Sequence, residues 1–348
     1  MKNIINSPEI LIKEKKNSTY IFLGGPIQGA PDWQKTIPNI DGITWVNPKR
    51  SKIIGKLSDK DWNFQVTWET KGLRISDAIL FWIPEKIEDI FGRDYAQTTK
   101  IELIENLVRG KKIFLGIHPN VNTRRYLCRK AKDYGIDIIH ETLEDCLKEI
   151  KNWIIDRNSV DKYYFTSDTH FSQKRTLELS KRPFKNTEDM DWTMIERWNN
   201  TVPVNSTVYH LGDFGNYDML KYLNGKINLV CGNYELKERE NKNIVDFIIN
   251  LKEKGFNKVF LSKEEIILKN FNNFPLILTH KPLDLKNNIN ISKNLLGLFG
   301  HIHGTQKIKK FGINVGVDSW NFKPVSEDEL MFYTNAIIKG YYDDDVFS

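Results

Sequence analysis

The chain has 348 residues, of which 40% are hydrophobic and 28% are charged, a composition typical of folded globular proteins. Its length favours two domains, and no apolar run approaches the ~18 residues of a membrane span, which excludes disordered, fibrous and membrane-spanning classes. The first residues lack the charged-then-apolar pattern of a signal segment, and the three cysteines lack CxxC spacing. These features predict a cytoplasmic protein without a disulfide framework.

The formal net charge of +6 is concentrated in the first part of the chain. Residues 1–155 carry 25 Lys and Arg against 20 Asp and Glu, and they include the pairs Lys49–Arg50 and Arg124–Arg125. This surplus favours attraction of a small phosphorylated molecule. A nucleic-acid partner is possible but not indicated, because the chain lacks a dense basic stripe.

Strand-like and helix-like segments alternate through the first half of the chain. Strands are predicted at Tyr20–Leu23, Ala78–Ile83, Ile113–Gly116 and Ile136–Ile139. Helices are predicted at Asp61–Gly72, Thr98–Arg109, Thr123–Tyr134 and from Thr142 through Trp153. This alternation predicts an α/β domain, Rossmann- or flavodoxin-like, in which helices flank an open parallel sheet and ligands bind at the carboxyl ends of its strands.

A polar linker at Asp156–Val160 ends this pattern, so we expect two domains at 1–156 and 157–348. Short apolar strands then follow at Tyr163–Thr166, Val208–Leu211, Ile227–Cys231, Lys258–Leu261, Leu276–Thr279, Leu296–Phe299 and Ile313–Val317. Each of these predicted strands ends in a polar or glycine-containing turn. A second, β-rich domain is therefore expected.

Five of those turns carry the residue types that ligate metals. They contain Asp168 and His170, Asp213, Asn233, His280, and the pair His301 and His303. If the strand ends converge, they bring two Asp, one Asn and four His to one rim, which is too many ligands for a single tetrahedral ion. This donor set suits two divalent ions such as Mn, Fe or Zn, which would activate water for attack on phosphorus. The alternative is that these residues are scattered polar positions of core and surface.

These turns resemble those of the calcineurin-like metallophosphoesterase superfamily over roughly residues 163–326. The resemblance implies an α-β-β-α sandwich and two divalent metal ions, with Mn²⁺ the expected ion in vitro. It assigns the first ion to Asp168, His170 and His303, the second ion to Asn233, His280 and His301, and the bridge between them to Asp213.

One position departs from that family. Tyr234 stands where the family usually has a histidine beside the scissile bond, in Gly232-Asn233-Tyr234-Glu235. A phenol with an ordinary pKa of about 10 donates a hydrogen bond but is a poorer general acid than imidazole. We therefore expect Tyr234 to take part in catalysis as a weaker general acid than a histidine. His210, on an apolar strand, is expected to be a buried, hydrogen-bonded histidine.

A second set of polar residues marks the first domain. The loop Gly24-Gly25-Pro26 lets backbone amides approach a ligand closely. Together with Trp68, Glu69, Asp77, Asp94 and the segment Thr99–Glu102, it resembles the nucleoside 2-deoxyribosyltransferase-like family over roughly residues 20–153.

That resemblance implies a role for each of these residues. Glu102 is the nucleophile that attacks the anomeric carbon of the sugar, and Asp77 and Asp94 assist. Trp68 and Glu69 hold the base, and a homo-oligomer is a possible assembly. The alternative is that Glu102 lies on a solvated helix face and Trp68 lies in the core.

Both resemblances indicate a nucleotide or nucleotide-derived ligand. The leading hypothesis is a bifunctional nucleotide-processing hydrolase, which combines phosphoester hydrolysis with cleavage or transfer at an N-glycosidic bond. One alternative is a metal-dependent phosphodiesterase or nuclease whose first domain only binds a nucleotide. In another, Tyr234 makes the metal domain a regulator without turnover.

Overall fold

The structure is a computed structural model that describes residues 3–11, 18–50, 58–92, 94–158, 162–240, 242–268, 274–282 and 296–341. The chain divides into two compact units, 1–159 and 160–348, and the division falls within the polar segment 156–160. Within the described residues, no helix is long and apolar enough to cross a membrane.

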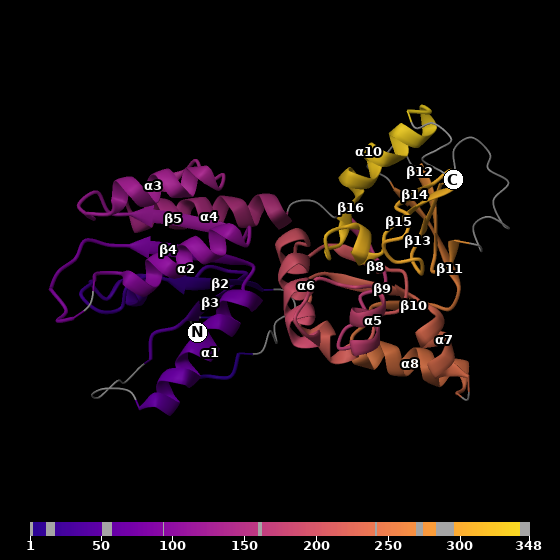
Figure 1. Cartoon of the computed structure of the whole chain (residues 1–348), viewed down its shortest axis with the longest axis horizontal. Helices are drawn as coiled ribbons and strands as arrows, with labels where there is room; N and C mark the ends of the chain where they lie inside the picture. The colour runs from indigo at the N-terminus through magenta and orange to yellow at the C-terminus, as the bar shows by residue number, and fades with distance from the viewer. Residues whose placement is uncertain are drawn as a thin grey trace. The chain divides into compact units, whose positions relative to one another are not determined.

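The first unit is built on a six-stranded parallel sheet (Figure 1). Its order is β1 (Ile4–Asn6), β3 (Ile43–Asn47), β2 (Thr19–Gly24), β4 (Ala78–Ile83), β5 (Ile113–Ile117) and β6 (Ile139–His140). Every residue of β2, β3, β4 and β5 is buried, as expected for parallel strands covered on both faces. From β3 to β6 the order is flavodoxin-like, and it confirms the predicted fold class.

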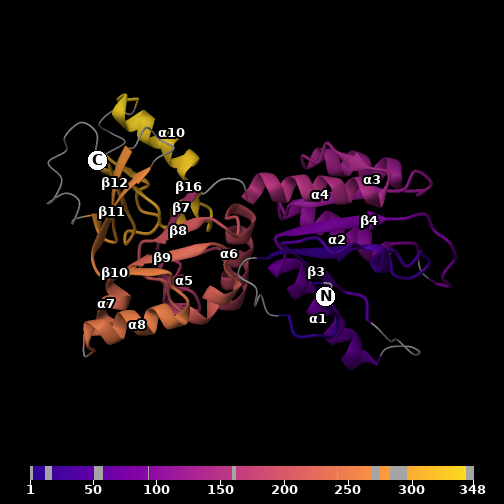
Figure 2. The same ribbon diagram turned by 180° about the vertical axis from the view of Figure 1, so that it is seen from behind.

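Helices cover both faces of this sheet (Figures 1 and 2). They are α1 (Asp59–Ile75), α2 (Gln97–Val108), α3 (Arg124–Asp133) and α4 (Leu143–Asn158), with a short 3-10 helix η1 at Trp33–Thr36. Ile150 and Ile154 of α4 pack in one core with Trp45. Helix α1 covers the other face of the sheet, where its Gly72 lies against the side chain of Phe22 from β2. The chain order changes direction between β2 and β4, so a ligand is expected at their carboxyl ends.

The second unit contains two mixed five-stranded sheets. The first sheet has the order β10 (Lys258–Phe260), β9 (Lys226–Val230), β8 (Thr207–His210), β7 (Tyr163–Thr166) and β16 (Val325–Ser326). The second has the order β11 (Lys263–Leu268), β12 (Phe274–Thr279), β13 (Leu296–Phe299), β15 (Gly312–Asn314) and β14 (Ile308–Lys309). In both sheets the central strands are parallel and an antiparallel strand lies at an edge.

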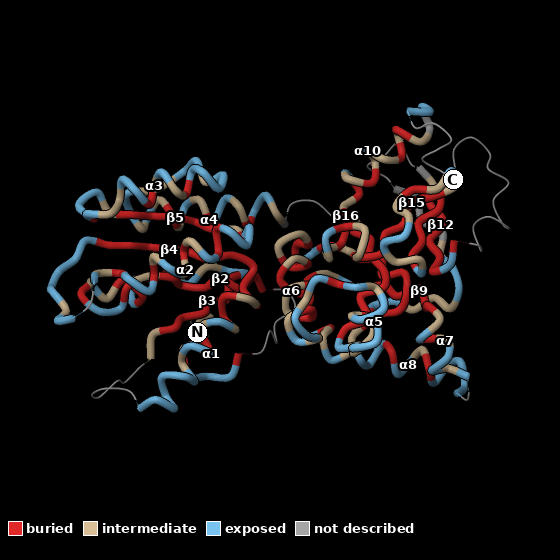
Figure 3. Tube along the Cα trace, in the orientation of Figure 1, coloured by how far each residue is buried: buried red, intermediate tan, exposed pale blue. Residues whose placement is uncertain are grey.

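Alternate side chains of the first sheet face opposite layers. Val208 and Leu229 pack against α6 (Thr187–Thr201) and α8 (Ile244–Lys254). Their neighbours Tyr209 and Val230 pack against Leu278 and Leu298 of the second sheet. The two sheets therefore share one buried core, visible as the buried strands in Figure 3.

Short elements complete the second unit. They are α5 (Lys174–Leu179), η2 (Tyr217–Tyr222), α7 (Asn233–Arg239), η3 (Val317–Ser319) and α10 (Glu327–Ile338). Among them, α10 packs against β7 and β16. The loops that follow β7, β8, β9, β12 and β13 carry the residues predicted to bind metal.

Candidate functional site

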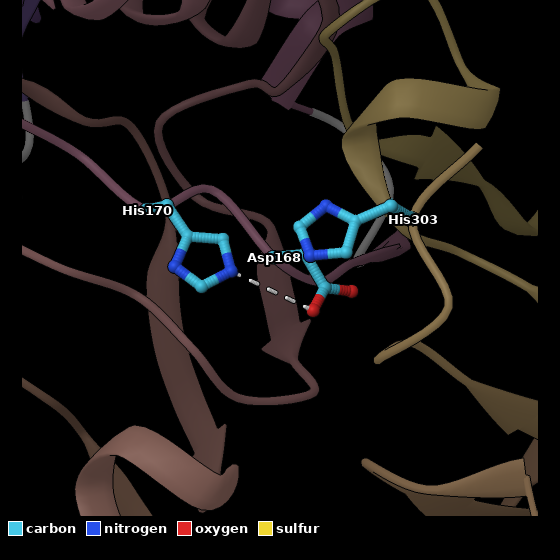
Figure 4. Close-up of side chains that lie close together, drawn as sticks. All are labelled: Asp168, His170 and His303. Carbon is cyan, nitrogen blue, oxygen red and sulfur yellow. Dashed lines mark ion pairs between the residues drawn. The ribbon is translucent and has the colours of Figure 1, made fainter. Parts of the chain in front are cut away.

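The structure brings the seven predicted metal ligands together. Within two overlapping groups the candidate ligand atoms lie within 4.8 Å of one another, the first comprising Asp168, His170 and His303 and the second Asp168, Asp213 and His280. Figure 4 shows the side chains of the first group directed toward one another. Parallel strands end at the same edge of a sheet, which explains why ligands far apart in sequence meet here.

Asp213 belongs to the second group and also lies close to the first. Its Oδ2 atom is 3.7 Å from Nε2 of His170 and 3.5 Å from Nε2 of His280. Beyond it, Oδ1 of Asn233 lies 2.9 Å from Nε2 of His280 and 3.0 Å from Nδ1 of His301. One carboxylate is thus positioned to contact both halves of the cluster.

Two buried ligand atoms have no hydrogen-bond partner among the described residues. They are Oδ1 of Asp168 and Nε2 of His170, which face each other at 4.0 Å. Burial lowers the pKa of His170 to about 4, so its ring is neutral at neutral pH. A buried carboxylate oxygen and a neutral imidazole nitrogen left unpaired are costly unless a cation lies between them, so this donor set fits a metal ion.

Hydrogen bonds outside the cluster orient three of the histidines. Nδ1 of His170 donates to Oε1 of Gln173 at 2.8 Å, and Nδ1 of His280 donates to the carbonyl of Leu211 at 2.7 Å. Nδ1 of His303 lies 3.1 Å from Oδ2 of Asp318. Each contact places the proton on Nδ1 and leaves Nε2 to ligate a metal.

The backbone around the cluster is held in unusual conformations. Asp168, His170, Asp213, His301 and His303 all have positive φ, between 48° and 71°. Such strain in non-glycine residues is found mainly at functional sites. Gly300 is required here, because a Cβ at this position would lie 2.0 Å from Oγ of Ser167 and 2.4 Å from Oδ2 of Asp168.

The sequence did not reveal the network that supports His303. The fully buried guanidinium of Arg182 donates to both carboxylate oxygens of Asp318 at 2.9 and 2.8 Å, and to the carbonyls of Asp168 and Thr169. Asp318 in turn holds His303. Nothing in the sequence marked Arg182 as part of this site.

The Arg182–Asp318 pair gives the first testable prediction. We expect Asp318→Asn to lower the free energy of unfolding by about 3–5 kcal/mol, because it leaves a buried guanidinium without its anion. It should also weaken metal binding by about 10–100-fold, because His303 loses the carboxylate that orients its ring. Urea unfolding and metal titration measure the two effects.

The matched control is Asp328→Asn, which removes the carboxylate of an exposed ion pair with Lys162. It should change the free energy of unfolding by less than about 1 kcal/mol and leave metal binding intact. Equal effects of the two substitutions would contradict the role given to Asp318.

Tyr234 and His210 are the other two residues of this unit that the sequence singled out. Tyr234 is 37% exposed, its ring edge faces His170 at 5.0 Å between centroids, and its backbone N–H donates to Oδ1 of Asp213. It therefore borders the cluster. His210 is fully buried, lies 2.9 Å from Oγ1 of Thr169, and has its pKa lowered to about 3 by burial, as expected for a core histidine.

In the first unit, Glu102 and Glu69 both have raised pKa values. Burial, together with the charges of Glu69 and Glu105, raises the pKa of Glu102 to about 8. Burial also raises the pKa of Glu69, which accepts a hydrogen bond from Nε2 of Gln65 at 2.8 Å. Gln65 in turn accepts from Nε of Arg50 at 2.7 Å. This arrangement can keep a proton on a carboxyl group at neutral pH.

Asp77 lies in the core of the first unit. It precedes β4 and is fully buried, and its Oδ2 accepts from the backbone N–H of Tyr20 at 2.7 Å. Tyr20 lies four residues before Gly24 on β2, so Asp77 is at the amino edge of the sheet, about 13 Å from its carboxyl end. This hydrogen bond gives Asp77 a place in the sheet, and its assistance in catalysis stays a prediction.

Trp68, Gly24 and Gly25 all take part in close packing within the first unit. Trp68 is buried, and its indole N–H donates to the carbonyl of Glu9 at 2.7 Å. A Cβ on Gly24 would lie 2.5 Å from the Phe81 ring, and one on Gly25 would lie 2.4 Å from the carbonyl of Trp82. Both glycines are needed for close packing at the carboxyl ends of β2 and β4.

Pro26 and Asp94 complete the predicted set. The carbonyl of Pro26 accepts from the indole of Trp33 at 3.2 Å, which fixes the loop after β2. Asp94 is exposed and lines a cavity of about 520 Å³ together with Tyr95 and Lys100. Among the described residues that line this cavity, Glu102 is absent.

Comparison with known proteins defines the first unit further. Residues 18–119 match the family model described as "Nucleoside 2-deoxyribosyltransferase like", so this segment is a nucleoside 2-deoxyribosyltransferase-like domain. No metallophosphoesterase family model matches the chain. The first resemblance is confirmed, and the second stays a prediction.

Two further proteins are similar to parts of the chain. The uncharacterized protein MJ1445 of Methanocaldococcus jannaschii is 29% identical over 188 residues, which cover 50% of this chain and 91% of that protein. The solved structure of the protein of unknown function AQ665 from Aquifex aeolicus matches the C-terminal half with 22% identity and a TM-score of 0.38, over 50% of this chain and 100% of that chain.

Proposed function

We propose that the second unit hydrolyses phosphoesters with two divalent metal ions. The observation that carries this proposal is the cluster itself, in which unpaired donor atoms of Asp168 and His170 lie beside a carboxylate, Asp213, that reaches both groups. Asp168, His170 and His303 would hold one ion, and Asn233, His280 and His301 the other. Mn²⁺ is the ion expected in vitro, and Fe and Zn also suit these donors.

The protein residues prepare this site before substrate arrives. When bound, two ions would supply positive charge to a phosphoryl group and lower the pKa of a water molecule. Asp213 would contribute negative charge that offsets the repulsion between two cations. Tyr234, at the border of the cluster, would donate a hydrogen bond to the leaving group.

The first unit would act on the glycosidic bond of a nucleoside or nucleotide. The Glu102 carboxylate would attack the anomeric carbon and form a C–O bond as the C–N bond breaks. The base would leave with the bonding electrons and take up a proton, and water or another base would then resolve the ester. Gly24, Gly25, Pro26 and Glu69 would shape the ligand site at the strand ends.

A second candidate is that the first unit binds a nucleotide without cleaving it. The raised pKa of Glu102 favours this candidate, because a protonated carboxyl group is not a nucleophile. In that case the chain is a metal-dependent phosphodiesterase or nuclease with a nucleotide-binding domain.

Incubation of the purified protein with Mn²⁺ and a nucleotide panel, followed by mass spectrometry, separates these candidates. The bifunctional proposal predicts both free base and a dephosphorylated or ring-opened phosphoester product. Phosphoester products without free base favour the binding-only first unit. Products from oligonucleotides alone favour a nuclease.

Tyr234→His gives the second prediction. We expect it to raise turnover of a simple alkyl phosphate by about 10²-fold, because imidazole is a better general acid for a poor leaving group. Turnover of p-nitrophenyl phosphate, whose leaving group needs no proton, should change little. Steady-state kinetics of both substrates provide the comparison.

Tyr234→Phe is the matched control, since it removes only the hydroxyl group. It should slow the alkyl phosphate more than p-nitrophenyl phosphate. If Tyr234→Phe turns over both substrates at the wild-type rate, the hydroxyl plays no part in leaving-group departure.

A further inference from the structure

The basic pair Arg124–Arg125 lies at a cavity that neither proposed reaction uses. The cavity has a volume of about 720 Å³ and lies beside α3 and the loop that follows β5. Its lining comprises Pro119, Asn120, Val121, Asn122, Arg124, Arg125, Cys128, Arg129 and Lys132. This volume is within the range of small-molecule sites, roughly 300–1,000 Å³.

The lining contains four cationic side chains and no acidic one. Arg124 pairs with Glu141 at 2.7 Å, and Arg129 pairs with Asp133 at 2.6 Å. Among the described residues, Arg125 and Lys132 have no acidic partner within 4.0 Å. Two positive charges are therefore left uncompensated at this cavity.

The position of Arg124 and Arg125 on α3 increases the positive potential at this cavity. Arg124 and Arg125 occupy the first turn of the helix, and the first turn contains no acidic residue. The amino end of a helix carries a partial positive charge, which acidic side chains ordinarily offset. Glu141 pairs with Arg124, whereas Arg125 keeps an uncompensated charge at this end of the helix.

A neighbouring cavity is lined by more acidic than basic side chains. The one of about 520 Å³ shares Asn120, Val121 and Asn122 with the cationic cavity, and its charged lining residues are Glu85, Glu88, Asp89 and Asp94 together with Lys86 and Lys100. Those carboxylates disfavour an anion on that side of the loop. An anionic group is therefore directed to the side of Arg125 and Lys132.

We propose that this cavity binds the phosphate or diphosphate group of a small ligand. Two uncompensated cations match a ligand group with at least two negative charges, which a phosphate monoester or diphosphate carries at neutral pH. Asn120 and Asn122 add neutral hydrogen-bonding groups at the same wall. The site is separate from Glu102 and from the metal cluster, so it does not depend on either proposed reaction.

Calorimetric titration of the full-length protein with inorganic pyrophosphate tests this assignment. EDTA is included, because it removes the divalent ions that would hold pyrophosphate at the metal cluster. We expect saturable binding that weakens as salt is raised. Arg125→Gln with Lys132→Gln should weaken it about 25-fold, since one charge at ~4 Å in water changes affinity about five-fold.

The matched control is Lys130→Gln, on the same helix but outside the lining, where it should change affinity less than two-fold. Glu102→Gln should also leave pyrophosphate binding unchanged, which separates this site from the proposed glycosidic reaction. If ADP binds with an affinity similar to that of pyrophosphate and adenosine does not bind, the phosphates are the part of the ligand that the cavity recognises.

Three results would overturn the assignment. They are absence of pyrophosphate binding at millimolar concentration, equal losses in Lys130→Gln and the double variant, and binding of a single-stranded oligonucleotide with neither pyrophosphate nor ADP. The last would assign the cavity to a nucleic-acid backbone.

Discussion

Asp213→Asn is expected to abolish metal-dependent phosphate release, with a loss on the order of 10³-fold or more. Asn keeps the Oδ1 acceptor that receives the Tyr234 backbone N–H, so the local backbone should hold its shape. It replaces the Oδ2 atom that lies 3.7 Å from His170 Nε2 and 3.5 Å from His280 Nε2. An amide NH₂ group cannot ligate two cations. Colorimetric phosphate assays with Mn²⁺ measure the loss of phosphate release.

The control for this variant is Asp218→Asn, the same chemical change at an exposed position of η2. Its activity should stay within about two-fold of the wild type. Base release by the first unit should also survive Asp213→Asn, because Glu102 belongs to the other unit. Undiminished phosphate release by Asp213→Asn would refute dinuclear catalysis at this cluster.

Glu102→Gln is expected to abolish release of free base, again by about 10³-fold, because an amide is not a nucleophile toward the anomeric carbon. In the wild type, base release should rise from pH 6 to pH 9 as Glu102 loses its proton near pH 8. Product quantification across this pH range measures both effects. Phosphate release should be unaffected.

The same carboxyl group predicts a trend in stability. The native state of the wild type keeps the Glu102 proton to a higher pH than the unfolded chain does. The free energy of unfolding should therefore fall between about pH 4.5 and pH 8, by at most about 5 kcal/mol. Glu102→Gln removes this slope. A flat wild-type profile would contradict the raised pKa, and base release that survives the substitution would exclude Glu102 as nucleophile.

The sequence predicted the architecture of both units well because the strands are strongly apolar. Ala78–Ile83 was recognised with its observed bounds, as a continuous buried run of a parallel strand. The strands β1 and β3 were not predicted. β1 has only three residues, and β3, Ile43–Asn47, ends in polar Asn before Pro48, so neither gives a clear period.

The convergence of the metal ligands also followed from the sequence, because all of them come after strands. By the same logic Asp77, which precedes β4, lies at the other edge of a parallel sheet. The core position of Trp68 was an alternative that the sequence offered, but its hydrogen-bond partner and that of Arg182 were beyond sequence reasoning. Their partners, Glu9 and Asp318, lie 59 and 136 positions away in the chain, and only the folded structure brings them together.

Metal stoichiometry tests the central claim most directly. Metal-free full-length protein should bind two Mn²⁺ ions per chain in a calorimetric titration, with the count confirmed by elemental analysis after removal of free metal. A variant carrying both Asp168→Asn and Asp213→Asn should bind neither ion tightly. Absence of tight Mn²⁺ binding by the wild type, or two ions retained by that variant, would contradict a dinuclear centre at this cluster.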